Sequence, residues 1–338
     1  MLRKTLTFIV MIVLALPSAV ASADAANDVF CGDLSPSDCR ILQDNAAVMD
    51  SLNAFAVQMH MALDDDGAEQ TRLSIQGNGQ FELDDESLQT INEMAANAGE
   101  AAWSALAELF LTSAKAVIWV EMTETTVEGD VTTEFNLLLK DGILVISADA
   151  LSALTGEDMT GMEGFGIDLN DAVGELLAES GMLPEADSAE MQEMEALADS
   201  AMSIARLPDS EVNGMEVAVF KTDFDLGAFL SLVSPEQLVA AYGDLDDPLT
   251  LSEIMDSIEV GEFSVTHYIG LDSSYTYGLD VLMDLSMSYT ENGQPMTSSI
   301  DMEMAALLSK FGEPVEVAIP EDIFAFPLAM LMQMGESG

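Results

Sequence analysis

The chain has 338 residues, of which 49% are hydrophobic and 21% charged, so its composition is that of a globular protein. Its 61 Asp and Glu residues against 9 Lys and Arg residues give a formal net charge of −52 at pH 7. Phosphate backbones and anionic lipid headgroups repel such a chain, which argues against nucleic-acid binding and electrostatic membrane docking. Two Cys and two His residues leave little material for a metal cluster, so we expect no metal and no cofactor.

The first 23 residues have the parts of a secretory signal peptide. Arg3 and Lys4 form a positive start, an apolar run covers 6–16, and Ala21-Ser22-Ala23 fits the small-residue pattern of a cleavage site. We therefore predict cleavage before Asp24. The product would be a secreted protein, extracellular or periplasmic, that is soluble once the signal peptide is removed.

No later segment predicts stable insertion into a membrane. The apolar run at 323–334 has twelve residues and contains Pro327, whereas a spanning helix needs about 20 apolar residues. The residues before Cys31, Asp28-Val29-Phe30, are not the Leu-small-small sequence of a lipoprotein signal. A lipid anchor at Cys31 is therefore not expected.

Cys31 and Cys39 predict a structural disulfide, because exported proteins fold in an oxidising compartment. The bridge would join the N-terminal segment to a helix beginning after Ser35, which suits the N-cap position, with Pro36 at the first helical position. No C-x-x-C motif is present, so a redox-active role is disfavoured.

Several segments alternate between apolar and polar residues, which predicts strands with one buried and one wet face. Half-wet strands are typical of antiparallel sheets. Short turns at 128–130, 140–142 and 291–293 agree, because parallel crossovers need a dozen or more residues. The alternating segments are 55–63, 73–76, 131–139 and 279–289.

Helical patterns lie between these strands. Apolar residues recur at helical spacing over 86–111 and 188–203, and Ser234-Pro235-Glu236-Gln237 has the form of a capping box. Such one-sided helices need an apolar partner, and the apolar sheet face provides it. We expect a single α+β domain over 24–338. Its expected helical insertions are about 86–111, 167–203 and 225–257.

Enzymatic function is not expected. The sequence contains no G-x-S-x-G, no H-E-x-x-H, no P-loop and no dinucleotide-binding glycine turn. His60 falls on the polar side of its strand and His267 on the apolar side of its own, far apart in the sequence. The acidic clusters at 64–67 and 244–247 resemble calcium ligands but lack the twelve-residue loop that ends in Glu, so solvated turns are favoured.

Two features of the composition leave alternatives open. The acidity fits a solubility device in a saline or cation-rich medium, where cations would condense weakly at the surface, or a surface for a cationic partner. The 23 methionines fit simple core filling, or an adaptable apolar cavity between sheet and helices, because methionine adapts to irregular apolar shapes.

Residues 210–320 carry a family resemblance. The segment Val212–Phe220 looks like a D-G-x-x-x-Y-x-Y strand, with Asp225-Leu226 beginning a helix, and 311–320 looks like a closing F-G-x-P-V-x-I-x-x-P segment. Three strands at 259–270, 278–289 and 296–307 lie between. This order resembles the LolA/LppX-like superfamily of exported lipoprotein carriers and lipid-binding lipoproteins. The resemblance implies a curved, unclosed antiparallel half-barrel with helices packed on its concave apolar face.

The first hypothesis is therefore a secreted, non-enzymatic protein that binds a lipid or another lipophilic small molecule between sheet and helices. The sequence lacks the lipobox of many relatives and has almost none of the basic residues on which the lipoprotein carriers depend, so a lipoprotein-transfer role is not expected. The alternative is an extracellular surface, sensory or protein-interaction module with a packed core and an acidic, salt-adapted exterior. The expected cavity residues, chosen by strand parity, are Phe55, Met59, Phe135, Met283, Met287 and Met302.

Overall fold

The computed structural model describes residues 29–65, 71–95, 109–126, 129–147, 165–170, 200–225, 227–228, 258–291, 294–320, 323 and 325–327. The predicted signal peptide lies outside these residues. Two helices are defined, α3 (Pro36–Asp50) and α4 (Asp85–Ala95), and residues 109–113 are also helical. The strands are β1 (Ala54–Asp65), β2 (Thr71–Glu82), β3 (Lys115–Thr126), β4 (Gly129–Lys140), β5 (Ile143–Ile146), β6 (Phe165–Asp168), β7 (Met202–Val212), β8 (Met215–Phe224), β9 (Ile258–Gly270), β10 (Thr276–Glu291), β11 (Gln294–Ser309) and β12 (Ala325–Pro327).

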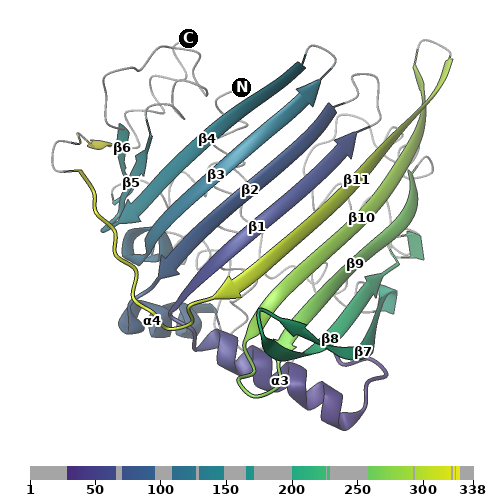
Figure 1. The fold of residues 1–338 in the computed structure, drawn as a ribbon, viewed down its shortest axis with the longest axis horizontal. Coiled ribbons are helices and arrows are strands. Elements are labelled where there is room, and N and C mark those ends of the chain that lie inside the picture. Colours follow the sequence, from purple (N-terminus) through teal and green to yellow (C-terminus); the bar gives the residue numbers. More distant parts are fainter. Residues whose placement is uncertain are drawn as a thin grey trace.

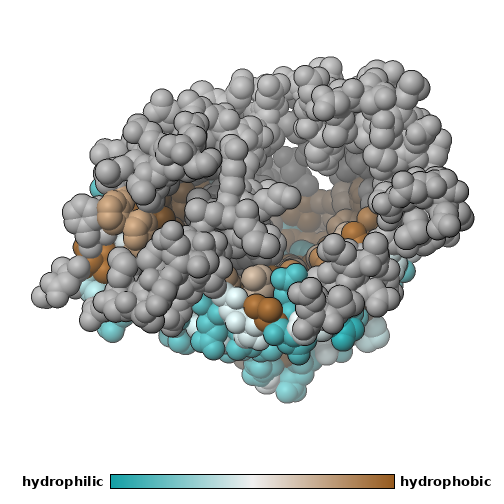
Figure 2. All heavy atoms as spheres, turned by 90° about the horizontal axis from the view of Figure 1, so that it is seen from above, coloured by the Kyte–Doolittle hydropathy of each residue, from teal (hydrophilic) through white to brown (hydrophobic). Residues whose placement is uncertain are grey.

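These strands form one open sheet in the order β12-β6-β5-β4-β3-β2-β1-β11-β10-β9-β8-β7 (Figure 1). Every neighbouring pair is antiparallel except β12 with β6, which are parallel. The sheet curves like half a barrel, and hydrophobic residues line its hollowed side while hydrophilic residues cover the outer surface (Figure 2). The expected unclosed antiparallel half-barrel is therefore confirmed.

The chain closes the centre of the sheet by pairing β1 with β11, which are far apart in sequence. Met61 lies opposite Met304 on β11 and opposite Ile75 on β2. Register partners on neighbouring strands point to the same side of the sheet, so these three side chains share one side. We call this side the apolar face and the opposite side, which carries His60, the polar face. Because side chains alternate along a strand, the two-residue pattern of the sequence fixes this division.

Tight turns join β4 to β5, where the sequence predicts one, and β7 to β8, where a turn replaces the first part of the expected strand 212–220. Asp141 and Gly142 have φ angles of 53° and 72°, and Asn213 and Gly214 have φ angles of 53° and 82°. Two successive left-handed residues are typical of the type I′ hairpin turn, whose twist matches that of the paired strands. These turns fix the β4–β5 and β7–β8 registers.

The helix α3 begins as predicted. The Ser35 hydroxyl oxygen accepts a hydrogen bond from the Asp38 backbone N–H at 3.2 Å, and Pro36 occupies the first turn. A disulfide joins Cys31 to Cys39, with 5.3 Å between their Cα atoms. The helix is thus tied to the segment that precedes it.

Contacts from α3 cover the apolar face at β8 and β9. Leu42 packs in a buried cluster with Ala218, Phe220 and Ile269. At the C-terminal half of the helix, Asn45 Nδ2 donates to the Ser274 carbonyl oxygen at 2.7 Å. Burial of a large apolar side chain such as Leu42, Phe220 or Ile269 contributes roughly 1.5–3 kcal/mol. This packing holds α3 against β8 and β9.

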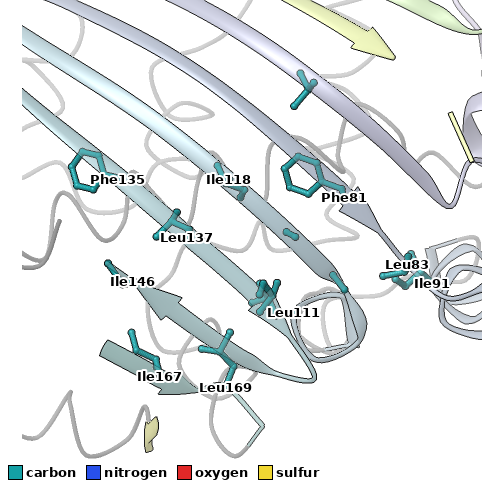
Figure 3. Close-up of a cluster of buried hydrophobic side chains, with 14 of the residues drawn as sticks. Phe81, Leu83, Ile91, Leu111, Ile118, Phe135, Leu137, Ile146, Ile167 and Leu169 are labelled. Carbon is teal, nitrogen blue, oxygen red and sulfur yellow. The ribbon is translucent and has the colours of Figure 1, made fainter. Parts of the chain in front are cut away.

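The second helix, α4, packs beside β2 and β3 at the same end of the sheet (Figure 1). The Asp84 carboxylate accepts hydrogen bonds from the Ser87 hydroxyl at 2.6 Å and from the Ser87 backbone N–H at 2.9 Å, and these bonds lower the Asp84 pKa. Ile91 belongs to a core of side chains from β1 to β6, from β11 and from residues 109–113. Figure 3 shows this closed cluster around Phe81, Leu111 and Leu137.

The structure differs from the expected helices at several ends. Residues 96–108 of the predicted helix 86–111 lie outside the described residues, as do 171–199 and 229–257. In the insertion expected over 167–203, Phe165–Asp168 form β6, and Met202 begins β7 opposite Phe224. The helical insertion expected over 167–203 is therefore wrong at both of its ends, where pairing with β5 and β8 places these residues in the sheet.

Candidate functional site

The centre of the apolar face is rich in methionine. Met122, Met61 and Met304 lie in one row across β3, β1 and β11, with Ile75 between the first two. Met302 and Met283 lie directly opposite each other in the next row, on β11 and β10. With Met59, these side chains form what we call the methionine patch. Its members are Met59, Met61, Met122, Met283, Met302 and Met304.

All six methionines of the patch are half-buried, whereas Ile75, in the same row between Met122 and Met61, is 1% exposed. The patch therefore keeps accessible apolar surface in the middle of the sheet. The end of the same face near α4 is closed, because Phe81, Phe135 and Leu137 are buried there in the core cluster. The apolar face thus has a packed end and a partly open centre.

The six cavity residues predicted from parity share the apolar face but not one environment. Met283 and Met302 adjoin each other, with Leu63 on β1 completing the row. Met59 lies four residues along β1 from Leu63, opposite Ala306 and Gly77. Gly77 adds no side chain to the apolar face beside Met59.

The two phenylalanines belong to the packed end. Phe135 is 5% exposed within the core cluster, and Phe55 stacks on Phe81 with 5.4 Å between ring centroids. Met287 has its backbone in β10, opposite Ser298, and its side chain lies outside the described residues. Whether any of the six contacts a ligand stays a prediction.

His267 also faces the apolar side, as its parity predicts. Its register neighbours are Leu279 on β10 and Phe220 on β8. Burial lowers the pKa of His267, since the charged imidazolium loses hydration there. His60, by contrast, is exposed on the polar face. The two histidines therefore lie on opposite sides of the sheet and form no pair.

The polar face is acidic. Asp64, Asp301 and Asp284 occupy register positions opposite one another on β1, β11 and β10. Arg72 forms an ion pair with Asp64, and the hydrogen bond between them lowers the Asp64 pKa. Tyr268 donates to the Asp280 carboxylate at 2.7 Å, which raises the pKa of Tyr268 to about 12.

Metal binding finds no support among the described residues, where no three His, Cys, Asp or Glu side chains gather as ligands would. Residues 66–67 of the acidic cluster 64–67, and the whole cluster 244–247, lie outside the described residues.

A pocket of 430 Å³ lies between the end of α3 and α4, away from the methionine patch. Its lining residues are Ser51, Asp85, Leu88, Gln89, Asn92 and Glu93.

Within the described part of the chain, no helix is long and apolar enough to cross a membrane. No protein-family model matches the sequence, and no curated protein matches it.

Solved structures do match the fold. The lipoprotein LppX from Mycobacterium tuberculosis aligns over 84% of this chain and 100% of its own, with 8% identity and a TM-score of 0.31. LprF from Mycobacterium bovis aligns over 85% and 98%, with 11% identity and a TM-score of 0.33. A putative outer membrane lipoprotein-sorting protein domain from Vibrio parahaemolyticus aligns over 82% and 92%, with 9% identity and a TM-score of 0.18. The likeness of these three structures to this chain concerns the fold alone.

Proposed function

We propose that this protein is a secreted, non-enzymatic binder of a lipid or another lipophilic small molecule. The methionine patch carries the proposal, because it leaves half-buried apolar side chains from four strands together on the hollowed side of the sheet. A fully packed domain buries such side chains to native density. Export follows from the signal-like sequence of residues 1–23.

An acyl chain would lie against the patch and displace water from it. Each buried methylene contributes roughly 0.8 kcal/mol, so a long chain binds without polar recognition. Methionine suits such a surface, because its flexible thioether side chain adapts to chains of different shape. The acidic polar face would keep the protein soluble and would attract cations weakly.

Two variants of neighbouring residues on β1 test the proposal. Met61→Glu places a carboxylate on the apolar face, and His60→Glu places the same group on the exposed polar face. We expect Met61→Glu to weaken binding of the neutral fluorescent probe N-phenyl-1-naphthylamine by about 10-fold or more, because a carboxyl group beside an apolar ligand is desolvated. His60→Glu should leave binding unchanged, and far-ultraviolet circular dichroism should show both variants folded.

Native mass spectrometry of protein from its own secreted fraction complements this test. A discrete added mass that leaves on organic extraction would support the proposal and identify the ligand. A bare polypeptide that also fails to bind the probe would refute it. That result would favour the alternative of a packed surface module, whose support is the closed core cluster at the α4 end and the aspartates of the polar face.

A further inference from the structure

A histidine, His267, interrupts the apolar face beside the methionine patch. His267 on β9 is flanked in register by Leu279 and Phe220, and along its own strand by Val265 and Ile269. Phe220 and Ile269 are covered by α3, whereas Val265 lies in the row that contains Met61 and Met304. His267 therefore stands at the boundary between the end covered by α3 and the partly open centre.

In the described part of the chain, no residue donates a hydrogen bond to a ring nitrogen of His267 or accepts one from it. Yet no fully buried side-chain nitrogen or oxygen in the described part of the chain lacks a partner. The ring nitrogens of His267 therefore keep accessible surface, so a bound ligand that displaces water from them must supply a hydrogen-bond partner in its place.

The charged groups around His267 are engaged elsewhere. Arg206 on β7 is the next residue in the row beyond Phe220, and its guanidinium lies over the Phe220 ring at 5.0 Å. Arg206 also pairs with Asp209 and, at 3.6 Å, with Asp38 of α3. Asp280 on β10 is on the polar face, where it accepts from Tyr268. An ion pair with His267 is thus not formed.

We propose that His267 is the polar recognition residue of the apolar face and forms a hydrogen bond with the hydroxyl or carbonyl oxygen of a neutral lipophilic ligand. This inference rests on the proposed function. The imidazole would meet the ligand's oxygen where the chain of the ligand runs onto the methionine patch.

Charge selects a neutral ligand over a fatty-acid anion. Burial lowers the pKa of His267, so at neutral pH the ring is uncharged and offers one N–H donor and one nitrogen acceptor. The chain carries a net charge of −52, which repels a carboxylate ligand. An alcohol, an ester or a ketone of the same chain length avoids that repulsion and satisfies the imidazole.

The test compares dodecane, 1-dodecanol and laurate as competitors of N-phenyl-1-naphthylamine. His267→Leu removes the hydrogen bond and keeps an apolar side chain, and His267→Gln keeps a donor and an acceptor. Thr222→Val is the matched control, because Thr222 is a half-buried polar residue of the same face, opposite Val265. Circular dichroism and melting confirm that each variant is folded.

In the wild type, we expect dodecanol to gain affinity relative to dodecane by about 2- to 10-fold over the same ratio in His267→Leu, since one hydrogen bond has that worth. His267→Gln should restore part of the preference, and Thr222→Val should keep all of it. Equal ratios in wild type and His267→Leu would overturn the role of His267 while leaving the proposed function intact. So would a preference for laurate that disappears in His267→Leu. Failure of all three competitors and of the probe to bind would refute the proposed function itself.

Discussion

The apolar face has a packed end and a partly open centre, so truncation at the packed end should mainly lower stability and truncation at the centre should mainly weaken ligand binding. Phe135 is 5% exposed in the core cluster, so Phe135→Ala leaves a cavity and should destabilise the fold by about 4 kcal/mol. Met302 is half-buried in the methionine patch, and Met302→Ala should cost only about 1–2 kcal/mol, since part of its surface is already accessible in the folded state.

Urea unfolding followed by far-ultraviolet circular dichroism measures these costs. For a denaturant dependence of about 3 kcal/mol per M, the midpoint should fall by about 1.3 M for Phe135→Ala and by about 0.5 M for Met302→Ala. Glu134→Ala is the control, because Glu134 precedes Phe135 and is exposed on the polar face. Its effect should stay within about 0.5 kcal/mol.

Ligand binding should show the reverse order. Met302→Ala should weaken binding of N-phenyl-1-naphthylamine by about 5-fold, the equivalent of about 1 kcal/mol of lost apolar contact, whereas Phe135→Ala should leave it within about 2-fold. The reasoning is refuted if Phe135→Ala abolishes binding without loss of stability, or if Met302→Ala destabilises as strongly as Phe135→Ala and binds normally.

Three further predictions concern stability. Replacing Cys39 by Ser should lower the free energy of unfolding by about 2.5 kcal/mol, since the unfolded chain regains the entropy of an eight-residue loop; an unchanged urea midpoint would contradict a stabilising bridge. Raising NaCl from about 0.01 to 1 M should raise the melting temperature, because the screening length falls from about 30 to 3 Å and the acidic residues repel one another less; a steady fall in melting temperature would contradict this. Because burial lowers the pKa of His267, the unfolded chain takes up a proton more readily than the folded chain as the pH falls below the ordinary histidine value of about 6.5. The stability of the wild type relative to His267→Leu should therefore decrease between pH 7.5 and 5.5, and a constant difference between their urea midpoints would show that His267 titrates normally.

Strands with one apolar and one polar face could be predicted from the sequence. Strands with apolar residues on both faces, and very short strands, could not. The alternation in β1, β4 and β10 identifies them directly, because opposite residues meet water and core. In β3, Val117 and Trp119 on the polar face follow Ala116 and Ile118 on the apolar face, so no alternation is visible. The short edge strand β12 and the strand β6 have too few residues to show a period.

The side of the sheet that carries the candidate site could be predicted from the sequence, but the burial of its individual residues could not. Parity alone places Phe135 and Met302 on the same side of the sheet, yet one is in the closed cluster and the other in the methionine patch. The difference arises from α4 and residues 109–113, which cover one end of the face. From the sequence, His267 is an isolated histidine, because its register neighbours Leu279 and Phe220 lie on other strands.

Residues close together in the chain specify the period of the strands, the turn at 141–142, and the cap and disulfide of α3, so these features could be predicted without the fold. The acidic charge follows from the composition. The pairing of β1 with β11 appears only in the folded sheet, where it places Met61 opposite Met304 and completes the methionine patch. Register between strands more than 200 residues apart is set by the packing of the whole sheet, and no local pattern encodes it.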